Sequence, residues 1–436
     1  MIGSALRRTG LGFNPLAYGI TWHSLMWAED PNWTPPSNLA GVSSWADNQG
    51  SHTVSQATST KQPFYLDRCA NLAGHPAVYF PGLLTSSTFT DLSQTYTVLY
   101  VGMILNSVTT NSPIASDAKT TSRVLIYQDG TNSRKTTGFA GANIAGSTYY
   151  YEPKVYRLKA AGASSALAVG SSTVASGSGG TNTLGQIALG NRADWDGSSA
   201  GSGVVTLGNY GPCYLFGIVA SDVTTAPNWS TFLTDLQSYL GIGATRNLVV
   251  CDGDSRTLGL GASTARNVPW PAQVDNQLDA VAAIINLGVG SQTVADMNTD
   301  AATQVDPLYS ASYNKKVVVC AGGINDCVGT AAATIQTRLS TYVSARQATG
   351  FQVLICTMPP ASTVAGANET TRQTVNTWIN AGSSGADVVV DLATDSRLSN
   401  TADTTYFASD GVHFTTTGYG VWASLIKTGL ASLGVT

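Results

Sequence analysis

Beyond residue 247 the chain repeats one hydrophobic pattern, a short apolar run followed by an amphipathic segment with helical spacing. The apolar runs occupy residues 248–252, 282–287, 316–321, 352–357 and 387–392. The amphipathic segments occupy residues 268–280, 293–300, 330–348, 368–381 and 417–433. Strands that are apolar at nearly every position are typical of parallel sheets buried on both faces. The pattern therefore predicts a doubly wound α/β domain over residues 247–436, with five parallel strands.

Before residue 241 the hydrophobic pattern is different. Short runs rich in Val, Tyr, Ile and Thr are separated by Gly, Ser and Asn clusters, at residues 75–80, 96–105, 123–128, 147–152, 154–160, 185–190 and 211–220. Short strands with turn signals between them predict an all-β sandwich over residues 1–241, with a hairpin in the Gly/Ser stretch 170–181 and a closing helix at 228–241. Since only residues 241–246 separate the halves, we expect them to pack against each other.

The amino-acid composition indicates where the protein works and which kinds of partner it binds. Charged residues make up 11% of the chain, against roughly 25% in ordinary soluble proteins, while 43% are hydrophobic. Such a surface is typical of extracellular or virion proteins. The 22 basic and 26 acidic residues give a formal charge of −4 without a Lys/Arg run, which argues against a nucleic-acid partner.

The hydrophobic runs are too short for membrane insertion or for a signal peptide at the start of the chain. We therefore expect a protein that works outside a cell to get there by lysis, on a particle, or after loss of a leader. Assembly into a homo-oligomer or into a virion is left open.

The six cysteines are too sparse for a disulfide scaffold, and we expect buried free thiols. Cys320 and Cys327 flank a tight turn, so a disulfide between them stays open. The Cys and His positions lack the spacing of a zinc site, and we expect no cofactor and no metal.

Polar and glycine residues gather directly after the predicted parallel strands, where open α/β sheets bind their ligands. They lie at 253–255, 288–291, 322–326 and 410–413. Each group alone is typical of a turn or a helix cap. Together they supply a complete acyl-transfer site, which needs a nucleophile, a base, a carboxylate to orient the base and donors for the oxyanion.

The roles follow from residue type. Ser255 fits the nucleophile, His413 the base and Asp410 its partner. The other three histidines lie in the first half, which leaves His413 as the one imidazole of the α/β half; they are His23, His52 and His75. Backbone N–H groups near Ser255 and Ser291, together with the Asn325 amide, fit an oxyanion hole.

These residues resemble the SGNH hydrolases, also called GDSL esterases and lipases. The resemblance covers residues 248–433 in the family's block order, with CDGDSRT (251–257), NLGVGSQT (286–293), GGIND (322–326) and DGVHF (410–414). Supporting matches are VPWPAQV (268–274), TMPP (357–360) and TTTGYGVWASLI (415–426). The resemblance implies a flavodoxin-like fold and a metal-free serine esterase. It also implies that Ser255 is nucleophile and oxyanion donor, Asn325 a second donor, His413 the base and Asp410 its partner.

Two positions depart from the family pattern. Arg256 replaces the fourth residue of the GDSL motif, and we expect its cation near the pocket rim. The block II glycine, which serves by its backbone N–H, falls on Ser291, and a shift of one residue would give that role to Gly290 instead. We favour the first alignment.

Residues 15–240 resemble the concanavalin A-like, or laminin G-like, jelly-roll modules, less specifically. The resemblance runs through SSWADNQG (43–50), AGHPAVYFPG (73–82), QIALGNR (186–192) and YLFGIVAS (214–221). Such modules bind glycans or proteins, or are structural. Five tryptophans could form a sugar-stacking platform, although we expect most of them, Trp45 in particular, to pack in the core: Trp22, Trp27, Trp33, Trp45 and Trp195.

Two weaker motifs lie in the loop after residue 190. Residues 197–201 match the nucleophile-elbow pattern in a Gly/Ser-rich loop with no following helix, so we expect no catalytic role. Asp194 and Asp196 could ligate calcium, although a solvated acidic loop is the simpler interpretation.

The sequence thus predicts a serine esterase that removes acetyl or other short acyl groups from a surface polysaccharide or a small ester, in the setting of a bacteriophage tail or virion. One alternative is a non-catalytic virion structural protein or adhesin that retains a hydrolase fold. Another is a lipase or polymer esterase that acts on long acyl chains.

Overall fold

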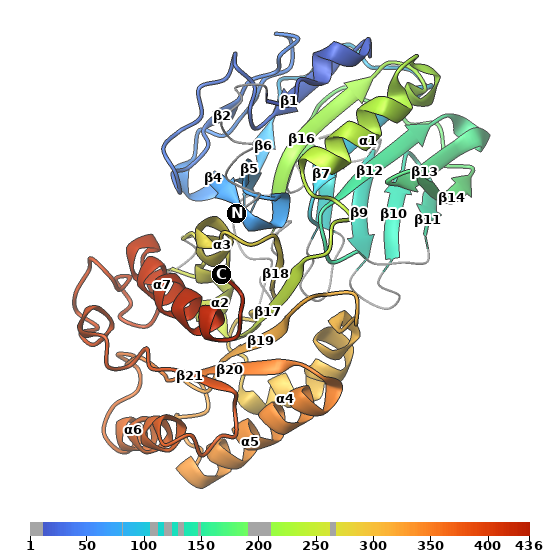
Figure 1. Ribbon diagram of the computed structural model, residues 1–436. Coiled ribbons are helices and arrows are strands. Elements are labelled where there is room, and N and C mark those ends of the chain that lie inside the picture. The colour runs from blue at the N-terminus through green and yellow to red at the C-terminus, as the bar shows by residue number, and fades with distance from the viewer. Residues whose placement is uncertain are drawn as a thin grey trace.

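The computed structural model describes residues 12–80, 82–104, 112–116, 124–129, 135–146, 150–190, 211–261 and 267–436. Antiparallel strands dominate the first half, and parallel strands alternate with helices in the second. Figure 1 shows the two halves as neighbouring bodies, with the first half in blue to green and the second in yellow to red.

One antiparallel sheet contains the longest strands that the structure describes in the first half. Its strands are β1 (Ser24–Trp27), β4 (Phe64–Cys69), β5 (His75–Tyr79), β7 (Tyr96–Gly102), β12 (Lys154–Ala160), β13 (Ser165–Val169), β14 (Ser172–Gly177) and β16 (Pro212–Val219). Among the described residues they pair in the order β14-β13-β12-β7-β16-β5-β4, with β1 also beside β16. β7 and β16 are buried at every position, as central strands covered on both faces must be.

A second antiparallel sheet in the first half is built from shorter strands. They are β2 (Ser44–Trp45), β3 (Val54–Ser55), β6 (Leu84–Thr85), β8 (Ser112–Ser116), β9 (Leu125–Asp129), β10 (Lys135–Phe139), β11 (Asn143–Ala145) and β15 (Ala188–Leu189). In the part of the chain that is described, their order is β11-β10-β9-β8-β15-β6-β3-β2. The first half is therefore β-rich, as predicted, and its jelly-roll identity stays a prediction.

Both sheets contribute to one apolar core. Val98 and Tyr100 of β7 share a buried cluster with Ile126 of β9 and Ile144 of β11. On the opposite face of the first sheet lies helix α1 (Trp229–Tyr239), which the sequence placed at 228–241. Figure 1 shows α1 crossing that sheet near β16 and β12. The first sheet is thus covered by apolar side chains on both sides.

The structure tests several expectations for the first half. Four of the five tryptophans are buried, with exposed fractions of 6%, 2%, 7% and 0% for Trp22, Trp27, Trp33 and Trp45, so they pack in the core and form no sugar platform. Trp195, Asp194, Asp196 and residues 197–201 lie outside the described residues. The hairpin expected in 170–181 is confirmed, because β13 and β14 pair antiparallel around it.

The second half is a parallel sheet between two helical layers. Its strands are β17 (Asn247–Gly253), β18 (Ala282–Asn286), β19 (Lys316–Ala321), β20 (Gln352–Cys356) and β21 (Val388–Val390). They pair in the order β18-β17-β19-β20-β21, which confirms the predicted five-stranded parallel sheet. The helices are α2 (Ser255–Leu258), α3 (Trp270–Gln277), α4 (Val294–Gln304), α5 (Ala332–Thr349), α6 (Ala367–Asn380) and α7 (Thr416–Ser432).

The strands of this sheet are mostly apolar because each face meets helices. Val250 of β17 faces the cluster that holds residues of α4, α5 and α6. Its neighbour Val249 faces the cluster with residues of α3 and α7. Adjacent strand residues point to opposite faces, so a strand covered on both sides needs no polar alternation.

The two halves share a junction that is both apolar and polar. Phe64 and Leu66 of β4 belong to the same buried cluster as Leu248 of β17. The carboxylate of Asp275 in α3 accepts hydrogen bonds from the Asn71 backbone N–H at 2.8 Å and from the Asn71 side-chain amide at 2.7 Å. The halves therefore pack directly against each other, as the short connection predicts.

The remaining helical turns are short 3-10 segments: η2 (Pro15–Tyr18), η3 (Ser59–Lys61), η4 (Ala70–Leu72), η5 (Gly162–Ser164), η6 (Val223–Thr225), η7 (Asp306–Leu308) and η8 (Ser396–Leu398). None of the helices in the described ranges has the length and hydropathy needed to cross a membrane. All six cysteines are buried free thiols, so Cys320 and Cys327 are not paired.

Candidate active site

The loop after β17 presents a serine at the carboxyl edge of the sheet. β17 ends at Gly253, and Asp254 caps the next helix by accepting a hydrogen bond from the Arg256 backbone N–H at 2.9 Å. Ser255 is then the first residue of α2 and is 9% exposed. A first helical residue has no intrahelical acceptor for its N–H. The same short turn therefore presents both the hydroxyl and the backbone N–H of Ser255.

The loop before α7 brings a histidine and an aspartate to that serine. His413 Nε2 lies 2.8 Å from Ser255 Oγ, and His413 Nδ1 lies 2.7 Å from Asp410 Oδ2. Gly411 has φ 63°, a left-handed conformation that glycine adopts without a steric penalty, and this tight turn lets residues three apart face each other. Sequence reasoning placed these three side chains together, and the structure does so.

The Asp410 carboxylate is oriented by its own loop. Its Oδ1 accepts hydrogen bonds from the backbone N–H groups of Val412 and His413, both at 2.9 Å, which leaves Oδ2 for the ring. Burial raises the pKa of Asp410, but the hydrogen bonds from the His413 ring and the two backbone groups outweigh it, so the pKa lies below its ordinary value. An ionised Asp410 favours the His413 tautomer with a proton on Nδ1, which leaves Nε2 to accept the Ser255 proton.

The loop after β18 is held against α2, the helix that begins at Ser255. The Asn286 side chain donates to the Thr257 carbonyl at 3.0 Å and accepts from the Gly288 N–H at 3.0 Å, which fixes the β18 loop against α2. Ser291 in this loop has φ 62°, in the left-handed region that favours glycine. Gly290 is not among the residues with positive φ. The backbone thus has a glycine-like conformation at Ser291, which favours the alignment that puts the family glycine there.

The Asn325 amide is oriented by a backbone carbonyl. Its Nδ2 donates to the Gln292 carbonyl oxygen at 2.9 Å, and a primary amide carries a second N–H for another acceptor. Asn325 comes from the β19 loop and Gln292 from the β18 loop, so the contact joins the loops that follow the two strands on either side of β17. Sequence reasoning found Asn325 but gave no sign of its carbonyl partner.

Arg256 is buried, contrary to the expectation from sequence that its cation lies near a pocket rim. It is 2% exposed, and its three guanidinium nitrogens donate to backbone carbonyl oxygens. The error arose because an arginine next to a nucleophile suggests a cation for the substrate, whereas these carbonyls come from irregular loops that no periodicity predicts.

The other histidines lie away from this edge of the sheet. His75 pairs with Glu29 at 3.2 Å, and His23 stacks on His52 with ring centroids 4.6 Å apart, all within the first half. In the described residues, no group of three or more His, Cys, Asp or Glu side chains is arranged to hold a metal ion.

With this geometry in view, comparison with known proteins identifies the second half. A profile of the GDSL-like Lipase/Acylhydrolase family matches residues 251–421. Residues 251–421 form a GDSL/SGNH hydrolase domain. An ester hydrolase is what this family implies. The match spans the β17 loop with Ser255 and the loop with Asp410 and His413.

Solved structures show similarity to part of this chain. The lipase/acylhydrolase from Enterococcus faecalis is 20% identical, with 43% of this chain and 96% of that one covered and a TM-score of 0.36. A member of the lipolytic protein G-D-S-L family from Veillonella parvula DSM 2008 is 19% identical, with 43% of this chain and 99% of that one covered and a TM-score of 0.37. No curated protein matches the chain.

Proposed function

We propose that the GDSL/SGNH domain is a serine esterase in which Ser255 is the nucleophile, His413 the general base and Asp410 the residue that orients the base. One observation carries the proposal. A single imidazole ring lies 2.8 Å from the Ser255 hydroxyl through one nitrogen and 2.7 Å from the Asp410 carboxylate through the other. A nucleophile, a base and an orienting carboxylate in hydrogen-bond contact are the arrangement that acyl transfer by serine requires.

In the proposed reaction, Ser255 Oγ attacks the acyl carbon while its proton passes to His413 Nε2. The negative charge then moves to the carbonyl oxygen, where the N–H groups of Ser255 and Ser291 and the Asn325 amide donate hydrogen bonds. The C–O bond to the alcohol breaks, and the proton on His413 goes to the leaving alcohol. Water then attacks the acyl-serine by the same route, which releases the acid and restores Ser255.

The proposed substrate is an acetyl or other short acyl ester on a surface polysaccharide, with a small ester as the simpler choice. The low charged fraction of 11% supports work at an extracellular or virion surface, and the first half would then bind glycan or serve assembly. No metal or cofactor takes part in the proposed steps. Release of long acyl chains and retention of the fold as a non-catalytic scaffold are the competing functions.

The test combines substrates with single substitutions. We expect p-nitrophenyl acetate to be hydrolysed faster than the butyrate and octanoate esters, and O-acetylated polysaccharides to release acetate. Ser255→Ala and His413→Ala should each lower kcat by at least about 10³-fold, because nucleophile and base act as a unit. Asp410→Asn should also be strongly impaired, because the ring then loses its charged partner.

Ser424→Ala and His75→Gln serve as matched controls. Ser424 is an exposed residue of α7, and His75 lies in β5 of the first half, so neither change should alter kcat. Near-normal turnover in a folded Ser255→Ala protein would refute the esterase. A preference for octanoate would favour a lipase, and a wild-type protein inert to every ester would favour the scaffold.

A further inference from the structure

Arg256, the residue after the proposed nucleophile, is buried among backbone carbonyls. Its Nε donates to Val412 O at 3.0 Å, Nη1 to Pro359 O at 2.9 Å and Nη2 to Pro360 O at 2.9 Å. The guanidinium carbon also lies 5.1 Å from the centre of the Phe414 ring. A planar guanidinium can hold several acceptors at fixed angles, which a lysine cannot. Because the side chain is 2% exposed, these acceptors rather than a substrate occupy its donors.

The carbonyls belong to two different loops. Val412 lies in the loop that carries Asp410 and His413, and the prolines lie in the segment 357–362, which follows β20. The two loops also contact each other directly. Ser362 donates its hydroxyl to the Asp410 carbonyl at 2.7 Å and its backbone N–H to the Gly411 carbonyl at 2.9 Å. Arg256 therefore joins α2, the 357–362 segment and the histidine loop at one point.

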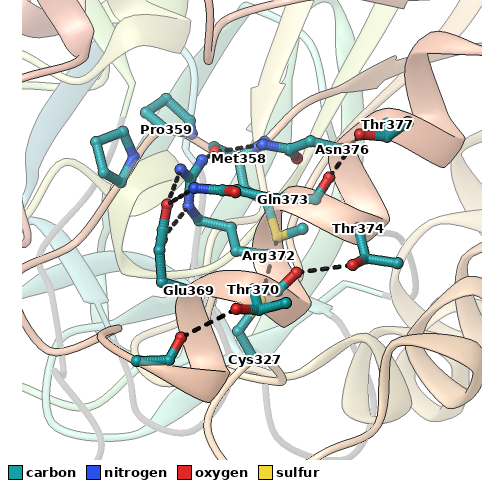
Figure 2. A network of polar contacts seen from close by, with 12 residues as sticks. Cys327, Met358, Pro359, Glu369, Thr370, Arg372, Gln373, Thr374, Asn376 and Thr377 are labelled. Atoms are coloured by element: carbon teal, nitrogen blue, oxygen red, sulfur yellow. Dashed lines mark hydrogen bonds and ion pairs between the residues drawn. The ribbon is translucent and has the colours of Figure 1, made fainter.

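The 357–362 segment is itself held from the side of α6. Figure 2 shows Asn376 and Arg372 turned toward the backbone of Met358. Asn376 accepts from the Met358 N–H and donates to its carbonyl, both at 2.9 Å, and Arg372 donates to the same carbonyl. Arg372 is in turn paired with Glu369, at 2.7 Å and 2.5 Å. The segment is thus a supported platform for the histidine loop.

We infer that Arg256 is a positioning residue, which keeps His413 within hydrogen-bond distance of Ser255 by fixing the Val412 carbonyl and the 357–362 platform. The inference rests on the proposed esterase function. Its geometric basis is adjacency, because Arg256 follows Ser255 in sequence and Val412 precedes His413. The Arg256 side chain donates to the Val412 carbonyl and so links the two reacting residues through their sequence neighbours. A loss of that tie would let the imidazole move relative to Ser255, and a displacement of about 1 Å can cost about 10²-fold in rate.

The groups around the guanidinium agree with this role. The titratable groups that act on it are Asp254, Tyr419, Arg372 and Asp410. Burial lowers the pKa of Arg256, and Asp254 partly opposes this effect. The guanidinium charge of Arg256 is therefore stabilised by hydrogen bonds to carbonyl oxygens and by a flanking aromatic ring rather than by an ion pair with a carboxylate.

The test compares Arg256→Met and Arg256→Lys with Arg346→Met. Arg346 is a matched buried arginine, 5% exposed, that pairs with Asp306 near the end of α5 and does not contact the histidine loop. We expect Arg256→Met to lower kcat on p-nitrophenyl acetate by about 10- to 100-fold with little change in KM. Arg256→Lys should keep part of the rate because it retains donors. Arg346→Met should keep the wild-type kcat per folded molecule.

A second readout does not depend on turnover. The ¹H–¹⁵N NMR signals of the His413 ring report its hydrogen bonds to Asp410 and Ser255, and Arg256→Met should shift or broaden them while Arg346→Met leaves them in place. If wild-type protein shows no hydrolysis, the esterase proposal fails, and the ring signals still decide the role of Arg256. Unchanged kcat and unchanged ring signals in Arg256→Met would overturn the inference. If that variant does not fold, kcat and the ring signals are measured in Arg256→Lys and Ser362→Ala instead. Each of these two changes weakens one part of the support of the histidine loop.

Discussion

Asp275 at the junction of the halves makes stability depend on pH in a way that can be worked out from its surroundings. Its carboxylate is 1% exposed and accepts hydrogen bonds from the Asn71 N–H, the Asn71 amide and the Cys69 thiol, the last at 3.0 Å. Burial raises the pKa of Asp275 to about 6, although these hydrogen bonds lower it in part. The folded protein therefore binds a proton at pH values where the unfolded chain has lost it.

The sign and size of the change in stability with pH follow from the difference between the folded and unfolded pKa values of Asp275. The pKa of Asp275 in the folded protein exceeds 3.8, its value in the unfolded chain. The contribution of the protonated Asp275 carboxyl to stability is therefore complete below pH 3.8 and is lost as pH rises toward about 6. A shift of roughly two units corresponds to about 3 kcal/mol at about 1.4 kcal/mol per unit. Asp275→Asn cannot ionise, so the stability of wild type relative to this variant should fall by about 2 to 3 kcal/mol between about pH 4 and about pH 7.5.

The assay is urea unfolding of wild type and Asp275→Asn at those two pH values, compared as a difference of differences so that other titrating groups cancel. Asp296→Asn is a control whose stability difference from wild type should change little between those two pH values. Hydrogen bonds from the Thr293 side chain and backbone lower the pKa of Asp296, so its contribution is present above 3.8 and is lost as pH falls. A wild-type advantage over Asp275→Asn that stays constant, or grows with pH, would refute the reasoning for Asp275.

Two further predictions concern the proposed oxyanion hole. Asn325→Ala should lower kcat on p-nitrophenyl acetate by about 10² to 10³-fold with little change in KM. The reason is that the Gln292 carbonyl holds the Asn325 amide, which would bond most strongly to the transition state. A change in KM alone would exclude that role. Ser291→Gly should raise the free energy of unfolding by up to about 1 kcal/mol and keep kcat, since glycine relieves the strain of φ 62° and retains the N–H; a tenfold loss of kcat would show instead that the hydroxyl participates.

The parallel sheet was predictable because burial on both faces leaves a clear mark in the sequence. Each predicted strand from 248–252 to 387–392 matches an observed one, although the last shortens to Val388–Val390. The ends of a strand are harder to predict than its existence because the hydrophobic run continues into the turn. Leu392, for example, is fully buried outside β21.

The antiparallel half was harder to predict because pairing rather than hydrophobicity defines several of its strands. β14 (Ser172–Gly177) contains mainly Ser, Thr, Gly and small residues, and it is a strand because β13 lies beside it. Conversely, the tyrosines of 147–152 suggested a strand, yet residues 150–152 form none. Tyr150 instead packs edge-on against Tyr156, with ring centroids 6.3 Å apart, so an aromatic residue can serve the core without joining a sheet.

The candidate site likewise contains residues that the sequence predicts and residues that it does not. Ser255, Asp410, His413 and Asn325 were found from sequence because the proposed chemistry needs those side chains. The supports around them use backbone carbonyls, which every residue carries, so residue type gives no sign of them. Pro359 and Pro360 illustrate the difference, because their rings restrict φ and so hold in place the two carbonyls that Arg256 binds. A substitution at either proline would change no reactive group, yet it would loosen the support of the histidine loop. The precision of such a site therefore depends on segments that a motif search passes over.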